Sequence, residues 1–284
     1  MVQYRHNKRN GVFIMINRST DGKQRVLSLS YGKDSLACLG AIEQLGLPLD
    51  RIIHAEVWAT DTIHADLPPM VEFKFKADAI IKERWGLEVE HYCASKVDRV
   101  VKDKVTYTDY FYQVMQSGKH IGEYKGFPMC KGNWCTKLKL NAVSKAQENC
   151  AGSIQYLGIA ADEPKRLERL DGLSKISPLF LIGWAEADAK QWCVDNDLLS
   201  PIYTTADRGG CWFCHNQGIG QLRLLRKNYP ELWQLLMKWD NDSPVSFKAD
   251  GHTVHDFDRR FQFEDEGLID PKARFRWSML ETGE

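Results

Sequence analysis

Residues 26–45 pass from a short apolar run to a polar loop and then to a helical pattern. Val26–Ser30 has the length and composition of a buried strand, and Ser35–Leu45 carries leucine and isoleucine at helical spacing before Gly46. A strand that runs directly into a helix is the first half of a β-α-β unit, and such units build parallel sheets. The pattern therefore predicts an α/β protein.

The same alternation of strands and helices continues along the chain. Strands are predicted at 12–16, 52–58, 87–92 and 154–159, and helices at 70–85, 136–150, 185–196 and 221–239, the last interrupted near Pro230. We therefore predict a doubly wound, mainly parallel sheet of the Rossmann type. Three sequence domains are expected: an N-terminal extension (1–24), an α/β domain (25–205) and a mostly helical C-terminal region that contains cysteines (206–284).

The charge balance limits the partners that the whole surface can attract. The 284 residues include 38 basic and 38 acidic side chains, so the formal net charge is zero and any basic binding surface must be local. No apolar run approaches the roughly 18–20 residues of a membrane span, and residues 11–16 are too few for a signal peptide. We therefore expect a cytoplasmic protein without membrane contacts. Its eight cysteines are then expected to be thiols or metal ligands, because disulfides are rare in reducing compartments.

The loop Ser30-Tyr-Gly-Lys-Asp-Ser35 combines several features of an anion-binding site. A glycine-containing turn before a helix brings backbone N–H groups and the positive helix end to one point, and Lys33 adds a direct charge. Asp34 would repel a bare phosphate, but it would help to hold a Mg²⁺ ion that bridges it to the phosphates. The loop is not a Walker A motif, because Leu27 takes the place of the first glycine and Asp34 follows the lysine. A turn without any ligand is the alternative.

The loop resembles the Ser-Gly-Gly-Lys-Asp-Ser pyrophosphate loop (PP-loop) of the N-type ATP pyrophosphatases, a superfamily that cleaves ATP between its α- and β-phosphates. Tyr31 departs from the glycine that is usual at its position. Further segments follow in the order of the phosphoadenosine phosphosulfate (PAPS) reductase family of that superfamily, and the resemblance covers roughly residues 24–217. These segments are Trp58–Thr62, Cys135–Lys139, Gly158–Arg166, Ile176–Leu179, Leu199–Tyr203 and Gly209–Cys214.

The resemblance implies an adenine nucleotide alpha hydrolase-like fold with a site for ATP and Mg²⁺. The residues implied in nucleotide binding are Ser28, Ser30, Tyr31, Gly32, Lys33, Asp34, Ser35, Asp61, Gly158 and Glu163. Catalytic roles are implied for Lys33, Asp34 and Arg166. Arg166 follows the carboxyl end of a predicted strand, where α/β sheets bind ligands, although a solvated helix face is the alternative. Ala160 stands where the family has an arginine, so one anion contact is absent or comes from Arg166 or Arg169.

Four of the cysteines form two close pairs, Cys130 with Cys135 and Cys211 with Cys214. Four thiolates from two loops can bind tetrahedral zinc or an iron-sulfur cluster, and the spacing does not distinguish the two. The resemblance favours a 4Fe-4S cluster, because relatives that transfer sulfur often hold one. Three alternatives are that Cys211 and Cys214 form a redox dithiol, that all four are buried thiols, or that the two pairs lie apart in space. Cys38, on the apolar face of the first helix, is expected in the core.

The reductases that form sulfite resemble one another in a C-terminal Glu-Cys-Gly-x-His element, whose cysteine attacks sulfur. Residues 240–284 contain no cysteine, so a sulfite-forming reductase is disfavoured. The resemblance then implies an ATP-dependent adenylyl- or sulfurtransferase that releases pyrophosphate and acts on a substrate such as nucleic acid. Two alternatives are a sulfonucleotide reductase or sulfotransferase that uses a partner's nucleophile, and a nucleotide-binding subunit without turnover. Candidate partners are an adenine nucleotide, a nucleic acid, a sulfur-donor protein and a second copy of the chain.

Overall fold

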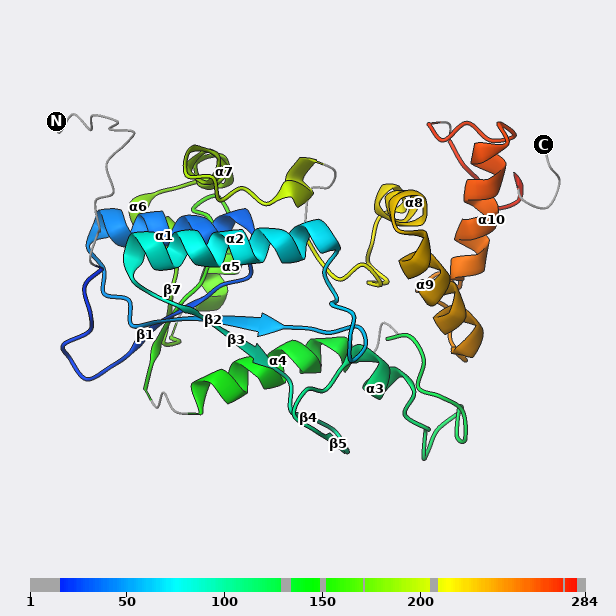
Figure 1. Ribbon diagram of the computed structural model, residues 1–284, viewed down its shortest axis with the longest axis horizontal. Coiled ribbons are helices and arrows are strands. Elements are labelled where there is room, and N and C mark those ends of the chain that lie inside the picture. Colours follow the sequence, from blue (N-terminus) through cyan, green and yellow to red (C-terminus); the bar gives the residue numbers. More distant parts are fainter. Residues whose placement is uncertain are drawn as a thin grey trace. The chain divides into compact units, whose positions relative to one another are not determined.

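A computed structural model describes residues 16–128, 134–148, 152–170, 172–204, 209–272 and 274–279 (Figure 1). Most of the predicted strand at 12–16 lies outside these residues, as do Cys130 and Cys150. The chain forms two compact units, and each is built from several segments of sequence. Of the described residues, the first unit takes those within 1–56, 68–93 and 140–209, and the second takes those within 57–67, 94–139 and 210–284. The sequence-domain boundaries expected after residues 24 and 205 stay predictions.

Within the described residues, the first unit is organised around a five-stranded parallel sheet in the order β3-β2-β1-β6-β7. Its strands are β1 (Arg25–Ser28), β2 (Arg51–Glu56), β3 (Val89–Cys93), β6 (Ile154–Tyr156) and β7 (Lys175–Ile176). In the central strand, Leu27 pairs with Ile52 of β2 and with Tyr156 of β6. The chain adds β2 and β3 on one side of β1 and later β6 and β7 on the other. This topology confirms the predicted, mainly parallel α/β fold.

Helices cover both faces of this sheet. Successive side chains of a strand point to opposite faces, so apolar side chains on both faces pack against helices. The helices are α1 (Lys33–Leu45), α2 (Pro68–Trp85), α5 (Pro164–Leu167), α6 (Pro178–Ile182), α7 (Glu186–Asp195) and the C-terminal part of α4 (Trp134–Gln147), with short 3-10 helices η1 (Glu168–Leu170) and η2 (Pro201–Thr204). Leu27 packs with α1, α2 and α7, whereas Val26 packs with Ala146 of α4. In Figure 1, α1 and α2 accordingly lie above the strands and α4 lies below them. Gly40 of α1 lies so close to Trp192 of α7 that a β-carbon would come within 2.3 Å of the indole.

The second unit has a mostly helical C-terminal part, as the sequence predicts. Its elements are β4 (Lys96–Val97), β5 (Val100–Val101), α3 (Tyr107–Phe111), α8 (Ile219–Asn228), α9 (Pro230–Asp242) and α10 (Val254–Asp265), together with the start of α4. Its core is rich in aromatic side chains, including Tyr107, Trp212, Phe213 and Trp239. The apolar side chains of α8 and α9 contribute to this core, with Leu235 only partly buried; the buried ones include Leu222, Leu225, Leu232, Trp233, Leu236 and Trp239. No helix in the described part of the chain is long and apolar enough to cross a membrane.

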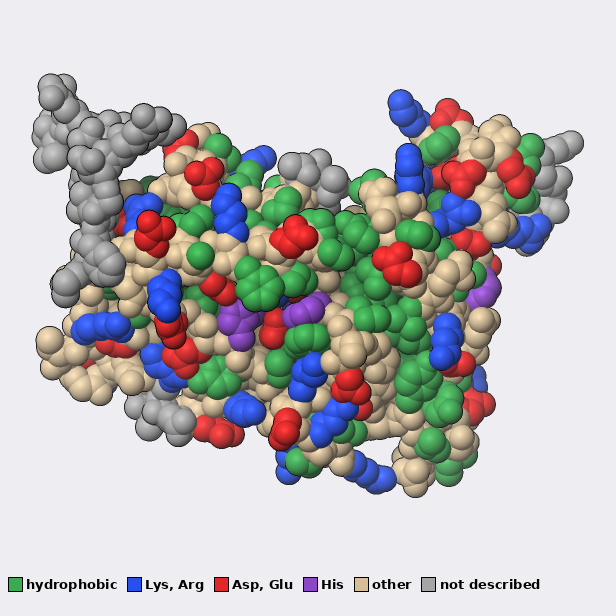
Figure 2. All heavy atoms as spheres, viewed as in Figure 1, with side chains coloured by type: hydrophobic (Ala, Val, Ile, Leu, Met, Phe, Trp, Pro, Cys, Tyr) green, Lys and Arg blue, Asp and Glu red, His purple; other side chains and the backbone are tan. Residues whose placement is uncertain are grey.

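The longer elements are confirmed, but their ends and the shortest elements differ from prediction. The helix expected over 221–239 is two helices, because Pro230 begins α9. The strand expected over 154–159 is too long, since β6 ends at Tyr156 and the chain then passes the start of α1 at Gly158. The sequence did not predict β7, α3, α6 or α10. On the face shown in Figure 2, acidic and basic side chains are interspersed, in keeping with the zero formal charge.

Candidate functional site

The loop Ser30–Ser35, here called the phosphate loop, joins the carboxyl end of β1 to the first turn of α1. β1 lies between β2 and β6, where the strand order reverses, and α/β sheets bind ligands in the crevice at such a switch point. α1 has 13 residues, and its N-cap is Gly32, which has no side chain to cap the first N–H groups. The positive end of this helix therefore faces the loop without a side-chain cap from its own N-terminus.

The two serines of the phosphate loop bond to each other and to the loop backbone. The Ser30 N–H donates to the Ser35 hydroxyl at 3.1 Å, and the two hydroxyl oxygens lie 3.0 Å apart. The Ser35 hydroxyl also donates to the Gly32 carbonyl oxygen at 3.0 Å. Ser35 is buried and Ser30 is exposed. The serines therefore close the loop into a compact turn, and of the two only Ser30 is accessible to a ligand.

Tyr31, which stands where the PP-loop pattern has a glycine, has a glycine-like backbone conformation. Its φ is 57°, in the left-handed region that glycine adopts freely and that costs other residues about 1–2 kcal/mol. The side chain is fully buried, and its hydroxyl donates to Asp78 of α2 at 2.5 Å. Tyr31 therefore has a backbone conformation that glycine adopts freely, and its ring is buried with its hydroxyl against Asp78 of α2 and His91 of β3.

Gly158 is the predicted site residue that requires glycine most clearly. A β-carbon at this position would lie 2.6 Å from the Asp34 carbonyl carbon and 2.6 Å from the Ser35 nitrogen. These are backbone atoms of a helix, so they cannot move aside as a flexible side chain could. Gly158 therefore lets the chain after β6 pass directly against the first turn of α1.

The ammonium of Lys33 contacts two carboxylates. Its Nζ donates to Asp34 Oδ1 at 2.7 Å and to Glu186 Oε2 at 3.1 Å. Burial alone would lower the pKa of Lys33, but the hydrogen bonds and charges of these two carboxylates outweigh it and raise the pKa. The Lys33 backbone N–H donates to the Tyr203 hydroxyl at 3.1 Å. The side chain of Lys33 is therefore charged. Its backbone N–H is hydrogen-bonded to a neutral hydroxyl oxygen, which an anion could replace.

Asp34 lies in a region crowded with negative charge. Burial raises the pKa of Asp34, and the carboxylates of Glu186 and Glu163 raise it further, although the hydrogen bond from Lys33 opposes them. An ionised carboxylate in these surroundings would be stabilised by a further cation. Asp34 therefore has the electrostatic setting of a residue that binds a metal ion or a second cationic group.

The segment after β6 places Glu163 and Arg166 together. Glu163 accepts a hydrogen bond from the Ala160 N–H at 3.2 Å and another from Arg166 Nη1 at 2.5 Å. The Arg166 side chain is 52% exposed, and Arg169 is exposed as well. Both the solvated-face interpretation and the phosphate-contact interpretation of Arg166 fit this exposure, so its catalytic role stays a prediction.

Two further predicted nucleotide-binding residues, Ser28 and Asp61, are not part of the phosphate loop. Ser28 is half-buried in β1, where it pairs with Ile53 of β2. Asp61 belongs to the second unit, where it accepts a hydrogen bond from Lys102 Nζ at 3.1 Å. Their roles in nucleotide binding stay predictions.

Sequence reasoning missed three residues that contact Lys33, namely Tyr203, Glu186 and Cys193. Tyr203 lies at the end of a segment that resembles the PAPS reductase family, so its position offered a signal that was not used. Glu186 stands in the first turn of α7, where an acidic residue is an ordinary partner of the helix dipole. No local pattern could have linked Glu186 to a lysine 153 residues away.

Three of the four predicted metal ligands lie in the second unit, and Cys130 is outside the described residues. Burial raises the pKa of Cys135 and raises that of Cys211 to about 12, and the charge of Cys214 adds to both shifts. The three thiols are therefore close enough to interact electrostatically. Among the described residues, however, no three His, Cys, Asp or Glu side chains are grouped tightly enough to hold a metal ion. The shared metal site stays a prediction.

Buried polar atoms without a hydrogen-bond partner lie close to these thiols. The Tyr107 hydroxyl and the Trp134 indole nitrogen are buried and unpaired in the described structure, and their rings lie 4.8 Å apart. Burial raises the pKa of Tyr107, and charges on Cys135, Cys211 and Cys214 raise it further. Unpaired buried donors are rare in folded proteins. We therefore expect these two donors to have a hydrogen-bond acceptor that is not among the described residues.

Two of the other described cysteines, Cys38 and Cys193, are buried in the first unit. Cys38 is fully buried in the core of the first unit, which confirms its expected place. Cys193 of α7 is also buried, and its thiol donates to the Lys33 carbonyl oxygen at 3.2 Å. All six described cysteines are free thiols rather than disulfides.

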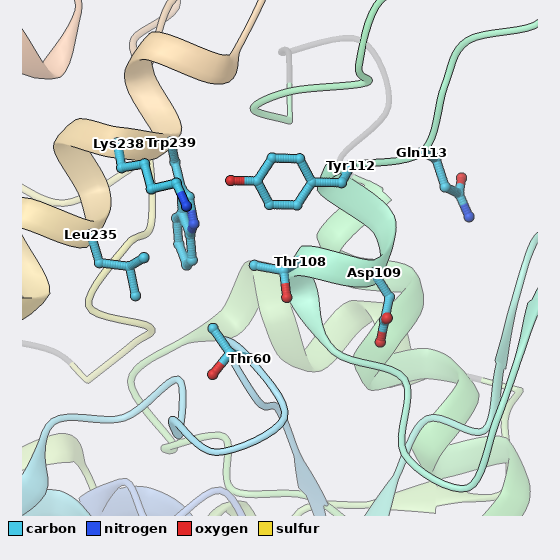
Figure 3. A pocket seen from close by; sticks show the side chains of 8 residues that line it. All are labelled: Thr60, Thr108, Asp109, Tyr112, Gln113, Leu235, Lys238 and Trp239. Carbon is cyan, nitrogen blue, oxygen red and sulfur yellow. The ribbon is translucent and has the colours of Figure 1, made fainter.

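The second unit also contains a cavity of about 510 Å³ that none of the predicted site residues lines (Figure 3). Its lining consists of Thr60, Thr108, Asp109, Tyr112, Gln113, Leu235, Lys238 and Trp239. Asp109 is held by a capping box with Thr106 and by the Lys102 ammonium at 2.7 Å, so its charge is compensated. Figure 3 shows Tyr112 directed toward α9, where its hydroxyl donates to Asp242. No pattern in the sequence predicted this cavity.

The fold and the loop together define an α/β protein with a turn containing glycine and lysine at the switch point of a parallel sheet. No family model matches the chain, and no curated protein matches it. Among solved structures, the chain is similar to the U34-tRNA thiolase NcsA from Methanococcus maripaludis with its 4Fe-4S cluster. The identity is 14%, the match covers 92% of this chain and 85% of that one, and the TM-score is 0.37. A likeness at this level says nothing of this chain's substrate, which must be inferred from its own residues.

Proposed function

We propose that this chain is a PP-loop ATP pyrophosphatase that adenylates an oxygen atom of its substrate. The observation that supports the proposal most is the phosphate loop itself, a serine-closed turn with a charged lysine at the start of α1. The chain after β6 passes directly against the backbone of this helix end at Gly158. Such a turn suits the β- and γ-phosphates of ATP.

In the proposed reaction, a substrate oxygen attacks the α-phosphorus of ATP, and the bond from that phosphorus to the oxygen bridging to the β-phosphorus breaks. Pyrophosphate leaves with that bridging oxygen, and the substrate proton passes to solvent or to a nearby base. The amides of the phosphate loop hold the β- and γ-phosphates before and during the reaction, and Lys33 compensates the growing charge of the departing pyrophosphate. The chain thus contributes position and charge, while ATP supplies the leaving group.

Asp34 fits the role of a Mg²⁺ ligand. Mg²⁺ is usually bound by one or two carboxylates together with substrate phosphates rather than by an all-protein cage. The neighbouring Glu186 and Glu163 make an added cation favourable at Asp34. The metal would screen the repulsion between this carboxylate and the phosphates, so Asp34 and Lys33 could serve the same nucleotide.

The proposal extends to sulfur transfer, because adenylation turns an oxygen into a good leaving group that sulfur can replace. Cys135, Cys211 and Cys214, with Cys130, would hold the iron-sulfur cluster or zinc. The unpaired Tyr107 hydroxyl fits such a group, because thiolate and sulfide sulfur accept hydrogen bonds. A 4Fe-4S cluster would supply a place to bind and hand over sulfur, whereas zinc would have a structural role.

The acceptor of the sulfur is proposed to be a nucleic acid, with a sulfur-donor protein and a second copy of the chain as further partners. A sulfonucleotide reductase that borrows a partner's nucleophile would instead release sulfite. A nucleotide-binding subunit without turnover would bind ATP and release no pyrophosphate. These products separate the three functions.

The test is pyrophosphate release from labelled ATP by the wild type, by Lys33→Ala and by Asp34→Asn, in the presence of total RNA or DNA. We expect both variants to fold and to lose turnover by at least about a hundredfold. Lys33→Ala should also weaken ATP binding, whereas Asp34→Asn should mainly change the Mg²⁺ dependence. Turnover at the wild-type rate in both variants would disprove the role of the phosphate loop. Sulfite release from a sulfonucleotide would support the reductase instead.

A further inference from the structure

A network of polar side chains lies behind the phosphate loop in the first unit. The Tyr31 hydroxyl donates to Asp78 Oδ1 at 2.5 Å and lies 3.1 Å from His91 Nε2. The same His91 nitrogen lies 2.9 Å from Asp78 Oδ2. A carboxylate only accepts hydrogen bonds, so Nε2 carries a hydrogen and both Tyr31 and His91 donate to Asp78. The loop is thereby tied to α2 and to β3 through one hydroxyl.

A second attachment holds the chain just before the loop. The Leu29 carbonyl oxygen lies 2.8 Å from His54 Nδ1, which must therefore be the protonated ring nitrogen. The other nitrogen, Nε2, then accepts from Lys74 Nζ at 2.9 Å. His54 and Lys74 are 6% and 5% exposed, and the His54 ring packs edge-on against Tyr31 with centroids 4.8 Å apart. Buried and hydrogen-bonded groups on two sides thus fix the entry to the loop.

The backbone of Tyr31 has an unfavourable conformation that this network stabilises. Within the described residues, the other non-glycine residues with positive φ are Asp98 and Asp197, and aspartate tolerates this conformation far better than an aromatic residue does. Such a conformation persists at a bulky residue only where the surroundings impose it. The residue that follows is Gly32, the N-cap of α1, so the left-handed turn decides where the first amides of the helix point.

We propose that Tyr31 is a positioning residue that acts through Asp78 and His91 to set the loop conformation that receives phosphate. The inference rests on the proposed ATP site. The amides that Tyr31 positions hold the same phosphates in bound ATP and in the transition state, so they stabilise both states equally. Loosening the loop should therefore raise KM for ATP and leave kcat nearly unchanged. A merely structural role would lower stability without this separation of KM from kcat.

The central variant is Tyr31→Phe, which keeps the buried ring and removes the hydroxyl. We expect KM for ATP to rise about tenfold, as for the loss of one hydrogen bond to a carboxylate, with kcat changed by less than about twofold. His91→Gln should raise KM in the same direction and serves if Tyr31→Phe folds poorly. The matched control is Tyr92→Phe on β3, whose hydroxyl donates to Glu90 at 2.8 Å outside the network. This control should leave KM unchanged.

Amide hydrogen exchange of the nucleotide-free protein tests the same idea without any turnover. Peptides that cover 29–36 should exchange faster in Tyr31→Phe than in the wild type or in Tyr92→Phe. If they do so while the wild type neither binds nor cleaves ATP, the positioning role stands and the proposed function is wrong. Unchanged exchange in both Tyr31→Phe and His91→Gln would overturn the inference. So would a Tyr31→Gly variant with wild-type KM, because the anchor would then be dispensable.

Discussion

Lys33 shows how single residues compete within the proposed site. Its ammonium is shared between Asp34, the proposed Mg²⁺ ligand, and Glu186, a residue of α7 whose side chain is 51% exposed. Asp34 and Glu186 take two of the three N–H donors of the ammonium, so a phosphate can bind the third, but the negative charge of Glu186 would repel it. Glu186 therefore acts as a competitor of the nucleotide in the ligand-free chain.

Removing this competitor should tighten ATP binding. An exposed ion pair contributes about 0.2–1 kcal/mol, so we expect Glu186→Gln to lower KM for ATP by about two- to fivefold without a loss of kcat. The effect should shrink as salt is added, because ionic strength screens exposed pairs. Glu168→Gln changes the same charge on an exposed 3-10 helix and should leave KM unchanged. A rise of KM in Glu186→Gln would instead make Glu186 part of the binding site.

Much of the proposed site could be predicted at the residue scale, because its residues are consecutive in a motif. Gly32, Lys33 and Asp34 stand where the loop pattern placed them, and Gly158 meets the same helix end. The side-chain contacts that hold Tyr31 and the phosphate loop in place could not be predicted. Tyr31 reaches partners 47 and 60 residues away, and a single sequence carries no signal for pairs so far apart.

At the scale of elements, prediction succeeded where periodicity extends over several turns. α1 and α2 have long apolar patterns and clear stops, so they were found with errors of a few residues. β7 has only two residues and α6 only five, and elements of that length owe their conformation to tertiary contacts rather than to intrinsic propensity. α10 was missed although it begins with a capping box between Thr253 and Asp256.

The packing of α10 on α8 depends on a buried carboxylate. The Glu264 side chain is 3% exposed and accepts hydrogen bonds from Arg223 at 2.6 Å and 2.9 Å and from Arg260 at 2.9 Å. Burial alone would raise the pKa of Glu264, but the two guanidinium groups outweigh it and hold the pKa below its usual value. Glu264 therefore links two helices through a charge that is present at neutral pH.

Glu264→Gln should destabilise the second unit by about 3 kcal/mol, since it leaves two arginines with reduced compensation. A depressed folded-state pKa means that the stabilisation is complete above the unfolded-state pKa, near 4.5, and is lost as pH falls through the folded-state pKa. The difference between wild type and variant, measured by urea unfolding, should therefore be constant from about pH 5 to 7 and shrink below about pH 4. Glu266→Gln, at an exposed position of the same helix end, is the control. A difference that grows in acid would contradict this account.

At the scale of the whole molecule, the fold class followed from the alternation of strands and helices, but the composition of the two units did not. Trp212 donates its backbone N–H to the Ala65 carbonyl and its indole N–H to the His64 carbonyl, both at 2.9 Å. These bonds join segments almost 150 residues apart within the second unit. Periodicity describes only local structure, so it cannot report which distant segments share a core.

The division into units assigns the two proposed chemistries to different parts of the chain. The phosphate loop belongs to the first unit, whereas Cys135, Cys211 and Cys214 belong to the second. Each unit has its own hydrophobic core. A defect in the proposed cysteine site should therefore leave the nucleotide site folded, and the reverse should hold as well.

Two variants test this separation. Cys211→Ser should lower the iron and sulfide content of anaerobically purified protein by at least about half, because a ligand is lost, while ATP binding by titration calorimetry stays within about twofold of wild type. Lys33→Ala should keep the iron and lose pyrophosphate release. Cys38→Ala controls for loss of a buried thiol and should keep both properties.

If Cys211→Ser loses ATP binding, or if Lys33→Ala loses iron, the two centres are one cooperative site. If the wild type carries neither iron nor zinc and its native thiols are all alkylated, the cysteines hold no shared metal, and Cys211 and Cys214 become a candidate redox dithiol.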